Sequence, residues 1–296
     1  TLQDLMTGKH MPVAMPDILS SDGKYVYMKS QTFTKDGKRV RIAPQRPDDQ
    51  YDEEVHLFSP ISFLDESWHQ RTYWIYGRAA GEGWAEFQLP PKRVPYGRIL
   101  CIDEENAYSY GRDLELLCNT SVSEYRFFSA NKEPARRVGI PNLEGSRWPE
   151  GRYPTGKENQ LAAHTVNWKE LAKQPVNKLT ALNYNWIEDE PEILVKAMVL
   201  ADDLLFVAGP RDVADEKSLW GRSNEEAFQE SMQEQAEWLR GDHGSFLQVV
   251  SKKGGETLKT YKMDHLPAFD GLIASEGKLY MTTADGALLC YESEKN

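Results

Sequence analysis

The chain has 296 residues, with 35 lysines and arginines against 46 aspartates and glutamates, and its formal net charge is −11. This length fits one large domain or two ordinary ones. The acidic balance argues against non-specific nucleic-acid binding, which needs clustered basic side chains. The sequence has no run of about 18 apolar residues that could form a membrane-spanning helix. Its 3 cysteines are too few for a disulfide framework.

Short apolar strands joined by tight turns recur along the sequence. Asp-Gly and Glu-Gly turns are typical of β-hairpins, because glycine tolerates the positive φ angles of primed turns. The clearest predicted strands are 18–21 with 24–28, 98–102 with 106–110, 197–200 with 204–208, and the last three, 271–275, 278–283 and 287–291. One aromatic residue occupies the same place in each group, namely Tyr27, Tyr108, Phe206 and Tyr280.

Further strands are predicted between these groups. The segments 56–64 and 71–77 are expected to pair with each other. The segments 114–118 and 125–128 are expected to complete the unit that begins at 98–102, and 177–187 holds another strand. A segment from about 131 to 159 contains four prolines without periodicity, which predicts a surface loop.

The spacing of the four aromatic residues predicts a repeat fold. They are separated by 81, 98 and 74 residues, whereas a four-stranded propeller blade takes about 40–45 residues. The first gap fits two blades, the second fits two blades with a long loop, and the third fits one blade with an insertion. We therefore predict an all-β fold, a β-propeller with about five to six four-stranded blades.

A single helix is predicted near 223–240. Residues 223–226 have the pattern of a capping box that begins at Ser223. Strong helix formers follow up to Arg240, and Gly241 stands where a C-cap glycine belongs. This pattern indicates a helical insertion in a strand-built frame, lying across the rim of the propeller.

Several segments resemble the repeats of PQQ-like β-propellers: GETL at 255–258, FDGLIA at 269–274 and GKLYMTTADG at 277–286. The stretch 56–77 and the region 203–215 are similar to large uncharacterised PQQ-like repeat proteins of planctomycete-type bacteria. These proteins share the repeat of the quinoprotein dehydrogenases and of an outer-membrane assembly lipoprotein scaffold. The resemblance implies the blade fold and an extracytoplasmic, periplasmic or secreted, location in a bacterium. It does not imply one function, because one fold hosts many activities.

The chain departs from the quinoprotein dehydrogenases at the positions that would carry their cofactor. Those enzymes have a docking tryptophan four residues after the repeat glycine, where this sequence has Lys259. Their quinone contacts adjacent cysteines, and no two cysteines are adjacent here. The residues of their Ca²⁺ site also have no counterpart that we can place. We therefore predict no cofactor, neither PQQ nor Ca²⁺.

The cysteines and histidines indicate no metal or haem site. Cys118 and Cys290 each lie ten residues after a repeat aromatic, so they are predicted to be equivalent positions. Cysteines at such positions, and Cys101 among apolar neighbours, are expected to act as small buried hydrophobic residues. None of the 6 histidines has a metal-binding spacing to another.

An aromatic cluster supplies the candidate binding residues. Aromatic, basic and acidic side chains gather at the start of the strand 71–77, where propeller loops carry binding sites. The predicted ligand-binding residues are Asp65, Trp68, His69, Arg71, Tyr73, Trp74 and Trp84. They suit a stacking surface for sugars or a planar ligand, and the alternative is that the rings are packed between blades.

The sequence leaves the reaction, if there is one, undetermined. The preferred interpretation is a non-catalytic extracytoplasmic propeller that binds a protein or a glycan through its blade-end loops. The alternative is an enzyme, either a quinoprotein-like oxidoreductase or a carbohydrate-active enzyme that uses the axial funnel. Residues 1–296 are expected to form one propeller domain or the C-terminal part of a longer propeller chain. No signal-peptide pattern is present in this chain, and a missing strand of the last blade is expected to come from the first residues or from a larger parent chain.

Overall fold

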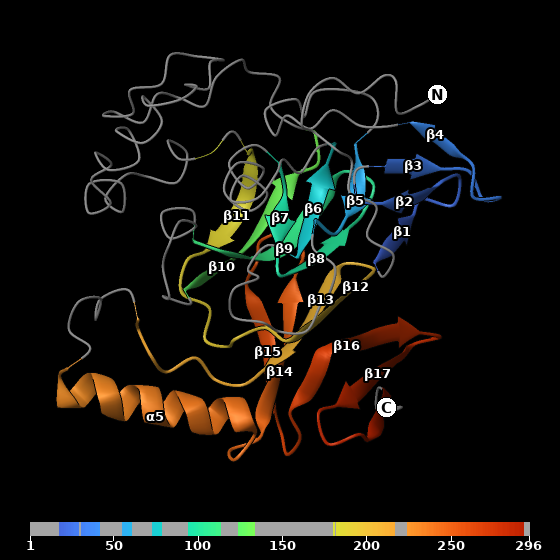
Figure 1. Cartoon of the computed structure of the whole chain (residues 1–296). Coiled ribbons are helices and arrows are strands. Elements are labelled where there is room, and N and C mark those ends of the chain that lie inside the picture. Colours follow the sequence, from blue (N-terminus) through green and yellow to red (C-terminus); the bar gives the residue numbers. More distant parts are fainter. Residues whose placement is uncertain are drawn as a thin grey trace, which may run out of the picture.

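The computed structural model describes residues 18–29, 31–41, 55–60, 73–78, 94–113, 124–133, 180, 182–216 and 224–292. This part of the chain is mostly β, with five antiparallel sheets and one helix (Figure 1). Each sheet is built from strands that follow one another in the sequence. The predicted all-β class with one helical insertion is therefore confirmed for the described residues.

The five sheets are numbered in chain order. Sheet 1 contains β1 (Leu19–Ser21), β2 (Val26–Met28), β3 (Gln31–Phe33) and β4 (Arg39–Arg41). Sheet 2 contains β5 (His56–Phe58), β6 (Trp74–Gly77) and β7 (Tyr96–Gly97). Sheet 3 contains β8 (Ile99–Ile102), β9 (Asn106–Arg112), β10 (Tyr125–Asn131) and β11 (Tyr184–Glu188). Sheet 4 contains β12 (Ala197–Ala201), β13 (Leu204–Gly209), β14 (Ser245–Ser251) and β15 (Thr257–Met263). Sheet 5 contains β16 (Pro267–Ser275), β17 (Lys278–Thr283) and β18 (Leu288–Glu292).

The predicted equivalence of the four aromatic residues is confirmed in four of these sheets. Each aromatic lies on the second strand of its sheet, directly opposite the residue seven positions earlier on the first strand. The pairs are Tyr27 with Ser20, Tyr108 with Cys101, Phe206 with Val199, and Tyr280 with Ile273. A constant separation across the first hairpin means that the four sheets begin with the same local design.

The number of strands per sheet differs from the prediction. Two of the five sheets have three strands among the described residues, rather than four. The described residues between Tyr108 and Phe206 contain sheet 3 and the start of sheet 4, so they show no second blade in that gap. The predicted strand 114–118 and most of the predicted loop 131–159 lie outside the described residues.

Five strands were not predicted, namely β3, β4, β7, β14 and β15. Turn chemistry explains β3 and β4. The residues Thr34 to Lys38 join β3 to β4, with Gly37 at φ 81° and its N–H donating to the Thr34 carbonyl at 2.9 Å. The turn from Thr283 to Ala287 repeats this Thr-x-Asp-Gly-x pattern between β17 and β18. The strand β15 was not predicted because it is exposed along almost its whole length and has no apolar alternation.

The sheets pack face to face in chain order. Strand β1 contacts β5, β6 contacts β8, and β12 contacts both β8 and β16. Since successive residues of a strand point to opposite faces, each inner sheet buries both faces. Phe127 on β10 faces sheet 4, and the next residue, Phe128, packs with Tyr96 of sheet 2. The largest apolar cluster lies between sheets 3 and 4.

The cysteines do not share one environment. Cys101 packs against the cluster between sheets 3 and 4, where burial raises the pKa of its thiol to about 12. Cys290 lies directly opposite Tyr280 but is exposed, so the prediction that it is a buried hydrophobic residue is wrong. The cause is that its face of sheet 5 has no packed neighbour in the described part of the chain. Cys118 lies outside the described residues.

The insertion between β13 and β14 is the helix α5 (Glu226–Arg240), which projects at the edge of sheet 4 (Figure 1). Gly241 caps its C-terminus with φ 85°, as predicted. The predicted capping box is wrong, because the N-cap residue is Glu225, which has extended backbone and no side-chain cap hydrogen bond.

The side chain of Gln235 fastens this helix to the chain that follows β13. Its Oε1 accepts hydrogen bonds from the N–H groups of Val213 and Ala214 at 2.8 and 3.2 Å. Its Nε2 donates to the Arg211 carbonyl at 3.0 Å. Gln235 is only 3% exposed, so its own amide group has little access to water.

Replacing Gln235 tests this attachment. We expect Gln235→Ala to lower the free energy of unfolding by about 2 kcal/mol, because it leaves buried donors and an acceptor unsatisfied. The measurement is urea unfolding followed by circular dichroism. Gln233→Ala, at an exposed position of the same helix, should change it by less than about 0.5 kcal/mol. Equal effects of the two substitutions would contradict the role of Gln235.

Candidate functional site

The structure describes two of the seven predicted binding residues. Asp65, Trp68, His69, Arg71 and Trp84 lie outside the described residues. Tyr73 is 0% exposed, its ring packs edge-on against Phe269 with centroids 5.3 Å apart, and Arg98 lies over it. Trp74 is half-buried on β6. Tyr73 therefore occupies an interior packing position, and the predicted stacking surface stays a prediction for the other residues.

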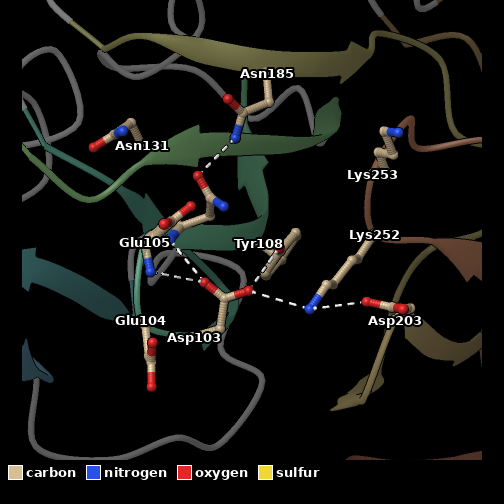
Figure 2. Close-up of a pocket in the computed structure, with 10 residues that line it drawn as sticks. Asp103, Glu104, Glu105, Tyr108, Asn131, Asn185, Asp203, Lys252 and Lys253 are labelled. Atoms are coloured by element: carbon tan, nitrogen blue, oxygen red, sulfur yellow. Dashed lines mark hydrogen bonds and ion pairs between the residues drawn. The ribbon is translucent and has the colours of Figure 1, made fainter.

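A polar hollow opens where the interface between sheets 3 and 4 reaches the hairpin turns (Figure 2). Its volume is about 740 Å³. Sheet 3 contributes one wall from the β8–β9 turn, the end of β10 and β11, and sheet 4 contributes the other from the β12–β13 and β14–β15 turns. The residues that line it are Asp103, Glu104, Glu105, Asn106, Tyr108, Asn131, Asn185, Asp203, Lys252 and Lys253.

The hollow exists because the facing residues change from apolar to polar along the strands. On β9 the face toward sheet 4 carries Tyr110, then Tyr108, then Asn106 at the turn end. On β10 the same face carries Phe127, then Ser129, then Asn131. Large rings close the interface at one end, and short polar side chains leave space at the other.

Asp103 is the most highly bonded group of the hollow. Its Oδ1 accepts hydrogen bonds from the N–H groups of Asn106 and Glu105 at 2.8 and 3.0 Å, and its Oδ2 accepts one from the Tyr108 hydroxyl at 2.9 Å. Burial alone would raise the pKa of Asp103, but these hydrogen bonds and the nearby Lys252 outweigh it and lower the pKa. The carboxylate is therefore ionised at neutral pH, and its acceptor positions are occupied.

The same aspartate–tyrosine arrangement occurs in sheet 1. Asp22 accepts hydrogen bonds from the N–H groups of Lys24 and Tyr25 at 2.8 and 2.7 Å, and from the Tyr27 hydroxyl at 2.7 Å. In both sheets the aspartate stands five positions before the repeat tyrosine. Since the arrangement recurs at a hairpin that does not line the hollow, it is a way of closing a turn, and Asp103 is a structural carboxylate.

Lys252 joins the two walls of the hollow. Its Nζ lies 3.2 Å from Asp203 Oδ1 in sheet 4 and 3.7 Å from Asp103 Oδ2 in sheet 3. The hydrogen bond to Asp203 raises the pKa of Lys252. Its carbonyl accepts a hydrogen bond from the Trp186 indole at 2.9 Å. Both the main chain and the side chain of Lys252 therefore bond residues of sheet 3.

Gly255 explains how the β14–β15 turn approaches sheet 3 so closely. Its φ is +78°, and a Cβ atom at this position would lie 2.6 Å from the ring of Trp186. A larger residue would therefore need both an unfavourable backbone angle and a displaced tryptophan. The glycine holds the turn that carries Lys252 and Lys253 in place beside sheet 3.

Two asparagines cross-link the strands at the rim. The Nδ2 atom of Asn185 donates to Asn106 Oδ1 at 2.9 Å and to Ser129 Oγ at 3.0 Å. This arrangement leaves Asn185 Oδ1 as an acceptor that bonds no other described residue, whereas the Nδ2 amide of Asn106 also hydrogen-bonds the Tyr108 hydroxyl. The hollow thus presents amide groups as well as charges.

The carboxylates of Asp103 and Asp203 are engaged in structural contacts. The described residues include no group of three or more histidines, cysteines, aspartates or glutamates placed to hold a metal ion. Within the hollow, the carboxylate of Asp103 has its pKa lowered and is fully bonded, and Asp203 is paired with Lys252. Among the described helices, none has the length and apolarity needed to cross a membrane.

Comparison with known proteins finds no match: no protein-family model fits the chain, and no curated protein has a significantly similar sequence.

This hollow is not among the sites predicted from the sequence. Its residues come from five separate segments that only the packing of sheets 3 and 4 brings together. One signal could have identified part of it, namely the Asp-x-x-x-x-Tyr spacing shared by Asp22 and Tyr27 and by Asp103 and Tyr108.

The pH dependence of stability tests the role of Asp103. Its folded pKa lies below the ordinary value of 3.8, so the carboxylate stabilises the fold above that value and loses this effect as the pH falls through the folded pKa. We expect Asp103→Asn to be less stable than the natural protein by about 1 kcal/mol at pH 7, with the difference shrinking below about pH 4.

Chemical denaturation at several pH values provides this measurement. Glu104→Gln, at the exposed neighbouring position, serves as the control and should stay within about 0.5 kcal/mol of the natural protein at pH 7. A difference for Asp103→Asn that is constant from pH 7 to pH 3 would contradict the assigned role.

Proposed function

We propose that the chain is a non-catalytic binding module of the PQQ-like β-propeller type, extracytoplasmic in location, which holds a partner at the turn ends of its sheets. The hollow between sheets 3 and 4 is its binding site. The observation that carries this proposal is that the residues lining the hollow fall into two groups. Asp103, Asp203 and Lys252 hold the two sheets together, while the remaining polar side chains surround an open space.

The order of the sheets supports the propeller arrangement. Five sheets of consecutive antiparallel strands pack against one another in chain order, which is how blades follow each other around an axis. The outer faces of the first and last sheets carry exposed apolar side chains. Ile273 and Leu288 on sheet 5 are 64% and 69% exposed, and Leu19 on sheet 1 is 51% exposed. A closed ring would cover these residues.

An enzyme is the alternative function, and one observation favours it. Burial and the nearby Glu216 carboxylate raise the pKa of Asp212 to about 7, which is the range of a general acid or base. Asp212 does not line the hollow and follows β13 in the segment that Gln235 holds. The binding proposal expects Asp212→Asn to leave partner binding unchanged, whereas an enzyme would lose turnover.

Ring closure can be tested at the apolar outer face of sheet 5. If another sheet covers this face in solution, Ile273→Lys and Leu288→Lys should each lower the free energy of unfolding by more than about 2 kcal/mol, because a charge would be buried. Leu258→Lys on β15 is the control, since Leu258 is also exposed, at 55%, but lies on sheet 4 and not on the outer face of the last sheet. If all three substitutions change the free energy of unfolding by less than about 0.5 kcal/mol, the outer face of sheet 5 stays in solvent.

The binding proposal can be tested by filling the hollow. Asn185→Trp places a large ring on an exposed rim position, and Glu230→Trp places the same ring on the exposed face of α5 as the control. Labelled protein is applied to peptide and glycan arrays. We expect signals at least about tenfold weaker for Asn185→Trp and unchanged for Glu230→Trp. Signals that survive in Asn185→Trp, or no signal for the natural protein, would contradict the proposal.

A further inference from the structure

The charges of the hollow fall into two groups. Asp103, Asp203 and Lys252 are engaged with one another across the interface between sheets 3 and 4. The side chains of Glu104, Glu105 and Lys253 form no hydrogen bond or ion pair with any other described residue, and all three are exposed. Only this second group is available to a ligand.

The available charges of opposite sign stand on opposite walls. Glu104 and Glu105 belong to the β8–β9 turn of sheet 3, and Lys253 belongs to the β14–β15 turn of sheet 4. Figure 2 shows Lys253 on the far side of the hollow from Glu104 and Glu105. The hollow therefore has an acidic side and a basic side, and a ligand with a cation at one end and an anion at the other would complement both.

The groups between the two sides match a peptide backbone. Asn185 Oδ1 is an acceptor, and Asn106 Nδ2, which already bonds the Tyr108 hydroxyl, carries a second N–H donor. The two amides are fixed to each other at 2.9 Å. A peptide group offers one N–H donor and one carbonyl acceptor, which is the complement of this pair. The orientation of each amide follows from its hydrogen bonds.

A saccharide fits less well because the hollow has no aromatic platform. Tyr108 is the aromatic residue among its lining residues, and it is 2% exposed with its hydroxyl bonded to Asp103. Trp186 is half-buried, with its indole N–H bonded to the Lys252 carbonyl. The volume of about 740 Å³ lies within the usual range of ligand sites, roughly 300–1,000 Å³, and accommodates a few amino-acid residues.

We propose that the hollow binds a short peptide segment that carries a basic side chain toward Glu104 and Glu105 and an acidic side chain toward Lys253. This inference rests on the proposed function, because it names the ligand of the same site. It adds a requirement for charges of both signs, which a general binding surface would not impose.

Charge reversal tests this requirement. The probe is the blocked tetrapeptide acetyl-Lys-Ala-Ala-Glu-amide, compared with acetyl-Gln-Ala-Ala-Gln-amide, and binding is followed by isothermal titration calorimetry. We expect the uncharged peptide to bind about tenfold more weakly. Lys253→Glu makes the available charges of the hollow all acidic, and Glu104→Lys with Glu105→Lys makes them all basic. Each change should weaken binding of the charged probe about tenfold.

The combined variant shows whether the single changes weaken peptide binding because they break the charge pattern or because they damage the site in general. With Glu104→Lys, Glu105→Lys and Lys253→Glu together, the two signs are exchanged but still face each other, so a probe that turns around should regain most of its affinity. Lys262→Glu, at an exposed position on β15, is the control and should have no effect. Failure of the combined variant to regain affinity, in a protein that folds normally, would overturn the inference.

The outcomes also distinguish this inference from the proposed function. A neutral trisaccharide such as chitotriose that binds all charge variants equally, and is blocked by Asn185→Trp, would overturn the peptide inference and leave the binding module intact. Absence of detectable binding of the charged tetrapeptide to the natural protein at millimolar concentration would overturn the inference as well.

Discussion

The packing of sheet 3 against sheet 4 is the interaction on which the rest of the structure depends. Tyr110 and Phe127 from one sheet meet Leu205 and Val250 from the other, all nearly or fully buried. Each large apolar side chain removed from water contributes about 1.5–3 kcal/mol. This contact fixes the separation of the two sheets, and so it also fixes the distance between the hairpin turns at their ends. The hollow follows from the same contact, because the strands continue past the apolar cluster into polar residues.

The turn ends show how one local device serves two purposes. In sheet 1 the Asp22–Tyr27 hydrogen bond closes a hairpin. In sheet 3 the equivalent Asp103–Tyr108 pair closes a hairpin and also places a carboxylate within reach of Lys252 from the next sheet. A bonded, ionised carboxylate is a poor proton carrier but a good structural anchor. In the binding site that we propose, the exposed groups around Asp103 therefore supply the contacts to the ligand.

The sequence predicts the local design of the sheets better than their assembly. The places of Tyr108 and Phe206 on second strands and the C-cap at Gly241 follow from spacing and turn chemistry, which act over a few residues. The exposed strand β15 lacks apolar alternation and gives no such signal. The hollow could not be predicted, because Asp103 and Lys252 lie far apart in the sequence and meet only through packing of two sheets.

We propose that the described residues bind a ligand at the turn ends of sheets 3 and 4. Backbone amide chemical shifts, recorded by NMR during titration with the charged tetrapeptide, test it most directly. We expect the chemical shifts to change at the residues around the hollow, from 103 to 108, at Asn131 and Asn185, and from 252 to 255. Changes centred instead on α5 or on the outer face of sheet 5, with the hollow unaffected, would contradict it.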